Sequence, residues 1–347
     1  RLFNRSASAM KNRSRLWTPE APLLNLRRYR EVALADPKIG VAGRFTVELI
    51  HKRTGLIAQR LEFPNMIVDA GLDWMGANRV DGCGFIGAGT GNAETTAIMT
   101  DLVAPLARTN NTVGVSTPSE SGFDTTTPGA EFAWYRMTRL FTTAQANGQL
   151  TEVGLFSASA GGTMFCRNLF RDGSGNAVAV TKTSEFELRV TYEVRWYAPP
   201  VTPYTTTING VAGLAAQATP TNLSAWNVGN QVLGLGFQFT HAMRIYADCT
   251  GNPTRLLNPS LGGSQPPGTS AQYSATSGVN AAYASGSYFR EATLEWNATT
   301  ANDTNLRGFE AAVGAQSFHW FEGAGVDKTN TQKLVVVYRK TWDRYTP

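Results

Sequence analysis

The stretch Glu185-Phe-Glu-Leu-Arg-Val-Thr-Tyr-Glu-Val-Arg-Trp196 and the stretch Lys333-Leu-Val-Val-Val-Tyr-Arg-Lys-Thr-Trp342 decide the fold. In the first stretch apolar and polar residues alternate without a break, which predicts a strand of an antiparallel sheet with one face in water. The second stretch repeats its apolar pattern 146 positions later. The matched pairs are Leu188 with Leu334, Val190 with Val336, Tyr192 with Tyr338 and Trp196 with Trp342.

The similarity continues upstream with a slowly drifting offset, as expected when loops change length after a duplication. Further matched pairs are Phe165 with Phe318, Gly154 with Gly308, Phe141 with Trp296, Asn147 with Asn302, and Lys182-Thr183 with Lys328-Thr329. A period this long indicates two copies of one domain, because solenoid repeats are far shorter. The match is best in the C-terminal strands of each copy, so we expect the front half of the second copy to have diverged or been replaced.

Length and composition agree with two β-domains. The chain has 347 residues, of which 42% are hydrophobic and only 16% charged, with 34 glycines. Low charge with many small residues favours a mainly β fold, here two antiparallel β-sandwich-like domains, with barrel closure as the open alternative. The expected organisation is a basic arm over 1–38, a first domain over 39–198, a Pro/Thr-rich linker over 199–207 and a second domain over 208–347.

Local patterns predict the individual elements. A hairpin is expected over 43–63, ended by Pro64, and a short helix over 66–77. The glycine-rich passage 84–92 is interpreted as a turn that needs positive φ. Long polar or glycine-rich loops are expected over 116–128 and 250–286. Further strands are expected over 130–142, 150–157, 163–170, 184–197, 232–247, 287–296, 304–312, 316–322 and 333–345.

The first thirty residues form a basic arm, with eight Lys or Arg side chains against the single acid Glu20. The remainder of the chain is close to neutral. Such an arm can bind nucleic acid or an acidic protein surface, or stay a solvated terminus. No recognition motif accompanies the charge, so sequence-specific nucleic-acid binding is not expected. The candidate assembly contacts are Arg13, Arg15, Trp17, Arg27, Arg28, Tyr29 and Arg30.

No motif of catalysis or cofactor binding stands out. Gly87-Ala-Gly-Thr-Gly-Asn92 fits neither the dinucleotide fingerprint nor the P-loop. His51, His241 and His319 lie outside metal-binding spacing, and no Gly-x-Ser-x-Gly elbow is present. We therefore expect no cofactor, no metal and no enzyme activity, with a glycan depolymerase as the alternative.

Cysteines and hydropathy indicate the compartment. Cys83, Cys166 and Cys249 are too few and too widely spaced for a disulfide framework, which fits a reducing compartment. No apolar run is long enough to span a bilayer, so membrane insertion is not expected, and the arm lacks the apolar stretch of a secretory signal. The tryptophans Trp134, Trp196, Trp296 and Trp342 are expected in the core.

Five motifs occur in a fixed order and carry a resemblance. They are Asn65-Met-Ile-Val-Asp-Ala-Gly-Leu72, Ile86-Gly-Ala-Gly-Thr-Gly91, Leu150-Thr-Glu-Val-Gly-Leu-Phe156, Phe165-Cys-Arg-Asn-Leu-Phe170 and Leu188-Arg-Val-Thr-Tyr192. The series is similar to a recurrent module in tailed-bacteriophage virion proteins, described as tail-fibre or tail-appendage components. It covers residues 40–197 and, more loosely, 287–345. The second copy lacks a clear Thr-Glu-x-Gly-Leu and has Asn305-Leu-Arg-Gly-Phe309 instead.

The resemblance implies a non-enzymatic structural protein of the tail, collar or baseplate region, made in the host cytoplasm and placed in the virion. Its expected partners are copies of itself and other virion proteins. Two alternatives stay open: a capsid or neck decoration protein, and a receptor-recognition adhesin that binds or cleaves a host surface glycan. The adhesin would need an aromatic platform, for which the candidates are Trp226, Tyr273, Tyr283 and Tyr288.

Overall fold

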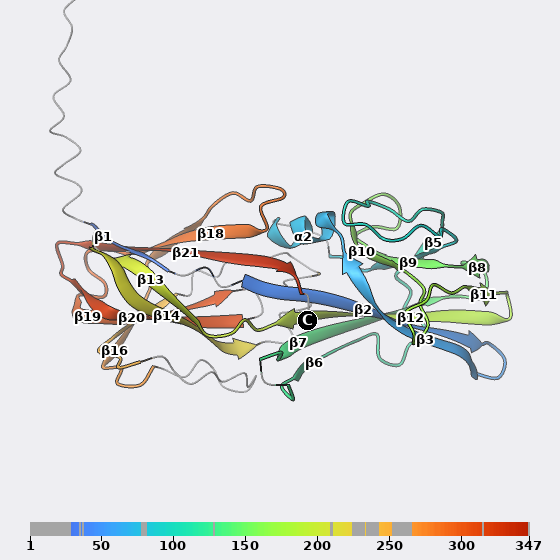
Figure 1. Ribbon diagram of the computed structural model, residues 1–347, viewed down its shortest axis with the longest axis horizontal. Helices are drawn as coiled ribbons and strands as arrows, with labels where there is room; N and C mark the ends of the chain where they lie inside the picture. The colour runs from blue at the N-terminus through green and yellow to red at the C-terminus, as the bar shows by residue number, and fades with distance from the viewer. Residues whose placement is uncertain are drawn as a thin grey trace, which may run out of the picture.

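The protein is an elongated body of mostly antiparallel β-sheet, as the alternating pattern predicted (Figure 1). The computed structural model describes residues 29–34, 36, 38–77, 82–127, 129–208, 211–223, 233, 243–251, 266–313 and 316–345. Helix within these residues is restricted to the short α2 (Asp69–Gly76), which is too short to cross a membrane.

The first half of the molecule consists of the strands from β2 to β12 along the chain. Its hydrogen-bonded order is β6-β7-β12-β2-β3-β10-β9-β4-β5, and β8 and β11 form a separate pair. The bounds are β2 (Lys38–His51), β3 (Ile57–Ile67), β4 (Phe85–Gly89), β5 (Pro105–Thr109), β6 (Ser119–Asp124), β7 (Phe132–Phe141), β8 (Gly148–Leu150), β9 (Glu152–Phe156), β10 (Met164–Leu169), β11 (Val180–Lys182) and β12 (Phe186–Tyr197).

The second half contains the remaining strands and also the first strand of the chain. Its order is β17-β18-β21-β1-β13-β14-β20-β19-β15-β16. The bounds are β1 (Tyr29–Ala33), β13 (Thr202–Ile208), β14 (Val211–Leu223), β15 (Arg244–Ala247), β16 (Ala271–Ser274), β17 (Ser277–Asn280), β18 (Phe289–Trp296), β19 (Asp303–Val313), β20 (Gln316–Lys328) and β21 (Lys333–Arg344).

Within the part of the chain that the structure describes, the two hydrogen-bonded orders match strand for strand, except that the second order also includes β1. In the first half, β2 pairs directly with β12 from Gly40–Tyr197 to His51–Phe186. In the second half, β1 lies between the equivalent strands β13 and β21 and runs parallel to β21. The order β13-β14-β20-β19-β15-β16 reproduces β2-β3-β10-β9-β4-β5. Of the two alternatives expected for the front half of the second copy, divergence or replacement, the described strands support divergence, because their pairing survives where sequence similarity does not.

Local details confirm that the halves are copies. Lys182 Nζ donates to Asn147 Oδ1 at 2.8 Å, and Lys328 Nζ donates to Asn302 Oδ1 at the same 2.8 Å. Both lysines are buried. In the adjoining turns Ala146 and Ala301, 155 positions apart, both adopt positive φ, of 51° and 57°. Left-handed backbone is uncommon for alanine, so its recurrence at matched positions indicates one inherited turn.

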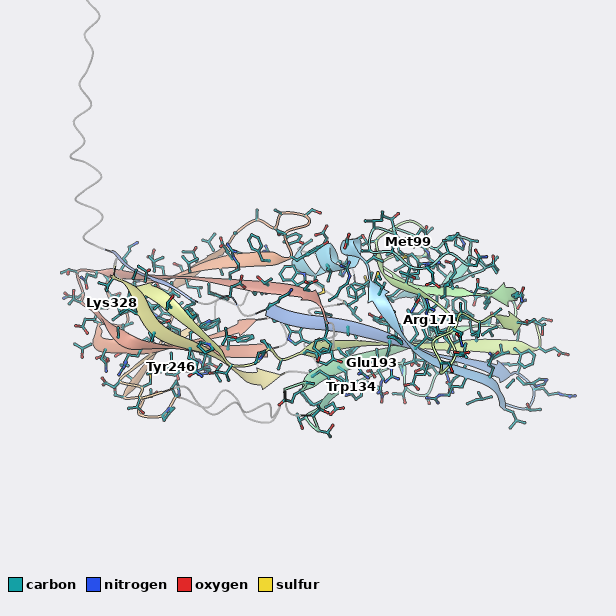
Figure 2. All side chains as sticks on the ribbon, viewed as in Figure 1. Met99, Trp134, Arg171, Glu193, Tyr246 and Lys328 are labelled. Carbon is teal, nitrogen blue, oxygen red and sulfur yellow. The ribbon has the colours of Figure 1, made fainter. Side chains whose placement is uncertain are left out.

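The halves join end to end. Lys38–Val41 at the start of β2 pair in parallel with Thr341–Arg344 at the end of β21. The C-terminal ends of β12 and β21 therefore meet in the middle of the body, and their starts lie at opposite ends (Figure 1). One cluster of buried apolar side chains runs through both halves. Trp196, Trp296 and Trp342 are fully buried, as predicted, whereas Trp134 is half-buried on an outer face beneath the Arg136 guanidinium, 4.1 Å from its ring centroid (Figure 2).

Several boundary predictions are wrong. Strand β3 continues through Pro64 to Ile67: Pro64 and Asn65 still pair with β2, and Met66 and Ile67 then pair with β10. The helix begins at Asp69 rather than at residue 66. The polar loop over 116–128 contains β6, and the loops over 250–286 contain β16 and β17. The expected linker is a strand from Thr202, because Thr-rich alternation pairs readily with β14.

The glycine-rich passage is strand β4, not a positive-φ turn. Its glycines are needed for close approach. A Cβ on Gly87 would lie 2.6 Å from the Phe156 ring, and one on Gly89 would lie 2.5 Å from the Ala104 carbonyl oxygen. Both separations are too short for real atoms. The strand can therefore lie this close to its neighbours only if these two positions are glycine.

Candidate functional site

The motifs that carry the resemblance converge on one buried ion pair. Glu152 of β9 and Arg167 of β10 are fully buried, and Arg167 Nε and Nη2 donate to Glu152 Oε2 at 2.9 and 2.7 Å. The Glu152 carboxylate also accepts the backbone N–H groups of Gly91, Val103 and Ala104, at 3.0, 3.0 and 2.8 Å. Each carboxylate oxygen thus has its own donors, which is the condition under which a buried charge is tolerated.

Arg167 extends the network to the segment between β4 and β5. Its Nη1 donates to Thr95 Oγ1 at 2.8 Å, and its Nη2 donates to the Ala93 carbonyl at 2.9 Å. A Cβ on Gly91 would lie 2.5 Å from Glu152 Oε1, so glycine is required there too. The ion pair therefore fixes the course of the β4–β5 loop, which has no regular hydrogen-bonding ladder of its own.

The Asn65–Leu72 motif holds the start of α2 against the same strand. The Val68 N–H donates to the Phe165 carbonyl at 3.1 Å, and a Cβ on Gly71 would lie 2.1 Å from that same oxygen. Burial raises the pKa of Cys166 on β10 far above its usual range, so its thiol stays protonated and unreactive at neutral pH. These motif residues build an internal framework.

The β4–β5 loop and the start of β5 present apolar side chains to solvent. Ile98 is 80% exposed, Val103 51% and Leu106 48%. Two acids lie on the same segment: Glu94 pairs with Arg171, and Asp101 pairs with Arg108 at 2.6 Å (Figure 2 labels Met99 and Arg171 in this region). Sequence reasoning singled out none of these residues.

Two of the tyrosines proposed for a glycan platform lie at the junction between the halves. Tyr283 donates its hydroxyl to Asp73 of α2 at 2.6 Å and stacks on Trp342 with ring centroids 5.8 Å apart. Burial raises the pKa of Tyr288, with Asp69 of α2 contributing. Tyr273 lies apart from them and donates to Asp303 at 2.8 Å. The described tyrosines therefore do not form one aromatic platform, and Trp226 lies outside the described residues.

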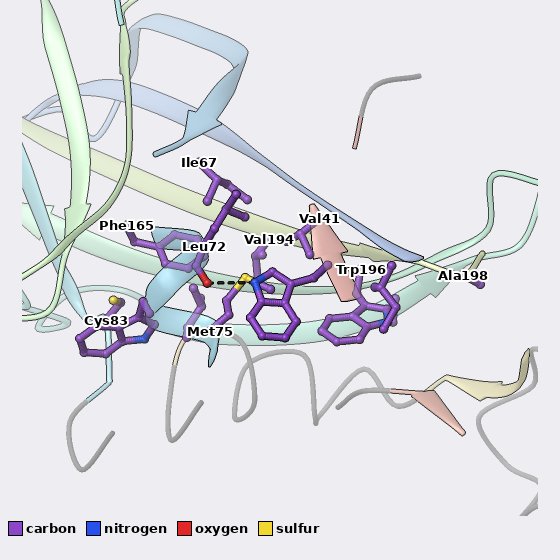
Figure 3. Packing of buried hydrophobic residues seen from close by; sticks show 14 of the residues in the cluster. Val41, Ile67, Leu72, Met75, Cys83, Phe165, Val194, Trp196 and Ala198 are labelled. Carbon is purple, nitrogen blue, oxygen red and sulfur yellow. Dashed lines mark hydrogen bonds between the residues drawn. The ribbon is translucent and has the colours of Figure 1, made fainter. Parts of the chain in front are cut away.

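The junction is densely bonded. Trp342 Nε1 donates to the Leu72 carbonyl of α2 at 2.9 Å, shown by the dashed line in Figure 3. Asp73 also accepts from the Gly286 N–H at 2.7 Å, and Arg344 pairs with Asp69. Tyr197 and Tyr345 stack with centroids 3.5 Å apart. These contacts favour a stiff body, because bending at the junction would break the bonds that join α2 to the second half.

The candidate arm contacts are divided by the structure. Tyr29 and Arg30 belong to β1, whose backbone pairs with Lys333 and Leu334 of β21, so this part of the expected arm is a strand of the second half. Arg13, Arg15, Trp17, Arg27 and Arg28 lie outside the described residues. The reason for the difference is that β1 pairs in parallel with β21 on the side that faces β13, so its residues supply hydrogen-bond partners for the β21 backbone.

The outer face of β3, β2, β12 and β7 holds a shallow groove of about 390 Å³, lined by arginines, glutamates and threonines. Its charges are paired: Arg189 with Glu48 at 2.7 Å, and Arg136 with Glu120 at 3.0 Å. This is the polar face that the alternation in β12 predicted. The Arg136–Glu120 pair is exposed and stabilises the fold only slightly, whereas Glu48 is buried beneath its partner.

The second half carries its own buried ionisable groups on β19 and β20. Tyr246 donates to Glu310, and His319 Nε2 lies 3.6 Å from Glu310 Oε1. Tyr204 donates to the fully buried Glu322, and burial raises the pKa of Glu322 to about 7 despite that bond. Among the described residues no group of three or more His, Cys, Asp or Glu side chains is arranged to hold a metal ion.

Comparison with known proteins adds no relative. No protein-family model, no curated protein and no solved structure matches the chain.

Proposed function

We propose that the chain is a structural protein of a tailed-bacteriophage virion, from the tail, collar or baseplate region. Its basic arm docks on a neighbouring protein of the particle, and the two β-halves hold a fixed distance and orientation between attachment points. The expected partners are further copies of the chain and other virion proteins.

The main support for the proposal is the set of contacts that the ordered motifs make. The ordered motifs that resemble the virion module supply the Glu152–Arg167 pair, the close-packed glycines of β4 and the contact between α2 and Phe165. These motif residues bond and pack inside the domain, as expected for a protein whose role is to hold a fixed shape. The bonded junction through Trp342 and Asp73 supports the same use, because a stiff body transmits position from one end to the other.

The first test is presence in particles. Quantitative mass spectrometry of purified virions from the phage that encodes the chain should find it in a fixed number of copies per particle. Its absence from washed particles, together with release as a free protein, would overturn the proposal.

The second test concerns the arm. Light scattering should give a defined oligomer for the full chain and a smaller species for a chain lacking residues 1–28, a cut that leaves β1 in place. Circular dichroism would check that the shortened chain is folded. If both chains were monomers that bound, or shortened, a host surface polysaccharide, the adhesin alternative would replace the structural one.

A further inference from the structure

The exposed side of the β4–β5 loop, together with Leu106 at the start of β5, is both apolar and held in place. We name it the β4–β5 surface and define it by Ile98, Val103, Leu106, Glu94 and Asp101. Large apolar side chains gathered on one exposed segment mark interaction sites more often than chance exposure does. Here the three apolar side chains are 80%, 51% and 48% exposed.

The β4–β5 surface is preorganised from below. The buried Glu152 carboxylate accepts the N–H of Val103 at 3.0 Å and of Ala104 at 2.8 Å, and Arg167 bonds the Ala93 carbonyl at 2.9 Å. The loop is thus anchored on both sides of Ile98. A partner that binds a fixed loop does not have to order it, which lowers the entropic cost of association.

The charges of this surface are asymmetric in exposure. The Glu94 side chain is 67% exposed while its partner Arg171 is 21% exposed, and Asp101 is 48% exposed while Arg108 is 8% exposed. The Arg108 guanidinium lies 3.5 Å from the centroid of the Phe156 ring and donates to the Gly161 carbonyl at 2.6 Å. An approaching molecule therefore meets the carboxylates before the guanidiniums, and a basic, partly apolar segment is complementary to it.

We propose that the β4–β5 surface binds the segment 11–28 of the N-terminal arm of a second copy of this chain. This inference rests on the proposed function and names the site at which the arm docks. The segment combines the bases Lys11, Arg13 and Arg15 with the apolar residues Leu16 and Trp17. It belongs to the basic first thirty residues and carries, in Trp17, an aromatic anchor of the kind that interface centres favour.

The geometry makes the contact head-to-tail. The segment 1–28 precedes Tyr29, which pairs with Lys333 at the start of β21. That start and β5 lie toward opposite ends of the body (Figure 1). Each copy then carries a donor segment in front of its second half and an acceptor surface on its first half. Such a heterologous contact builds a ring if the rotation closes and a filament if it does not.

Cysteine cross-linking tests the contact in the full chain. The native cysteines are all buried, so Trp17→Cys combined with Ile98→Cys introduces the reactive pair. After mild oxidation we expect disulfide-linked chains of two or more copies, and a dimer when the two single variants are mixed. The matched control is Trp17→Cys with Val279→Cys, because Val279 is 71% exposed on the second half. A disulfide closed within one chain, or equal linking in the control, would overturn the proposal.

A non-covalent test uses Ile98→Lys and, as its control, Val279→Lys. We expect Ile98→Lys to weaken self-association at least tenfold by sedimentation and Val279→Lys to leave it unchanged; equal effects would contradict the proposal. The proposed function and the proposed docking site can be contradicted separately. If the chain is found in particles and needs its arm to assemble, yet Ile98→Lys associates normally, only the docking site is wrong. If the cross-link forms but the chain is absent from particles, the virion function is wrong.

Discussion

The two halves share a strand order but differ in how many hydrogen bonds their buried glutamates accept. In the first half Glu152 is bonded by Arg167 and by three backbone N–H groups. In the second half Glu322 accepts from Tyr204, while its Oε2 has no hydrogen-bond partner within the described part of the chain. A duplicated β scaffold therefore tolerates very different buried chemistry, because the backbone ladder fixes the strands whatever the side chains do.

A second difference concerns closure of the sheet. The first half joins β2 to β12 directly, whereas the second half needs β1 from the start of the chain between β13 and β21. The second half is therefore built from both ends of the sequence. The completion of the second half therefore depends on the residues that directly follow the segment 1–28.

The largest expected effect comes from breaking the first-half network. Glu152→Ala leaves a buried guanidinium and three N–H groups without their acceptor, and should lower the free energy of unfolding by about 3–5 kcal/mol. Urea unfolding followed by circular dichroism measures it. The control is Glu62→Ala, which removes the partner of Arg44 from an exposed pair and should change stability by less than about 1 kcal/mol. Equal losses in the two variants would show that the network does not hold the half together.

The next effect sharpens the contrast through pH. The folded-state pKa of Glu322 is about 7, above its ordinary value of 4.5, so the folded state holds this proton more tightly than the unfolded state. Its contribution is therefore fully present below about pH 4.5 and is lost as the pH rises through 7. We expect stability to fall by about 2–3 kcal/mol from this group between pH 5 and 8.

Glu322→Gln isolates that contribution, because the amide still accepts from Tyr204 but does not titrate. Urea unfolding of the native chain and of the variant at several pH values should give curves that diverge as the pH rises, with the variant the more stable at pH 8. Parallel curves would mean that Glu322 is ionised, or water-solvated, in the folded protein across this range.

The sequence predicted most of the first-half strands and the C-terminal strands of the second half, because their alternation is long and unbroken. The strands β7, β9, β10, β12, β18 and β19 all lie within two residues of their expected ends. Short edge strands were missed. The strand β6 has the sequence Ser-Glu-Ser-Gly-Phe-Asp, which reads as loop, and forms only because β7 offers a partner. Pairing of this kind is non-local and leaves little trace in sequence.

The candidate site was predicted less well. A glutamate within the apolar strand 150–157 and an arginine within 163–170 could have suggested a buried ion pair, since charged residues are rarely buried unless paired. The β4–β5 surface leaves no such signal, because exposure of Ile98 depends on how a loop folds over its neighbours. The tyrosines Tyr283 and Tyr288 misled for the opposite reason: an aromatic residue in a polar loop looks exposed until the facing helix α2 is known.

The smallest effect tests whether the halves are energetically equivalent. Lys182→Met and Lys328→Met each remove a buried ammonium that donates to a matched asparagine, Asn147 or Asn302, and leave the turn around it in place. Each should lower the free energy of unfolding by about 1.5 kcal/mol, the lower end of the range for a hydrogen bond from a charged group. Because the two sites lie in different halves and share no partner, the double variant should lose the sum of the two single losses.

Hydrogen exchange measured by mass spectrometry would locate each effect: protection should fall first in β8, β11 and β12 for Lys182→Met, and in β19–β21 for Lys328→Met. If either variant loosened both halves equally, the bonded junction through Trp342 and Asp73 would make the body a single cooperative unit, and the equivalence of the copies would be structural but not energetic.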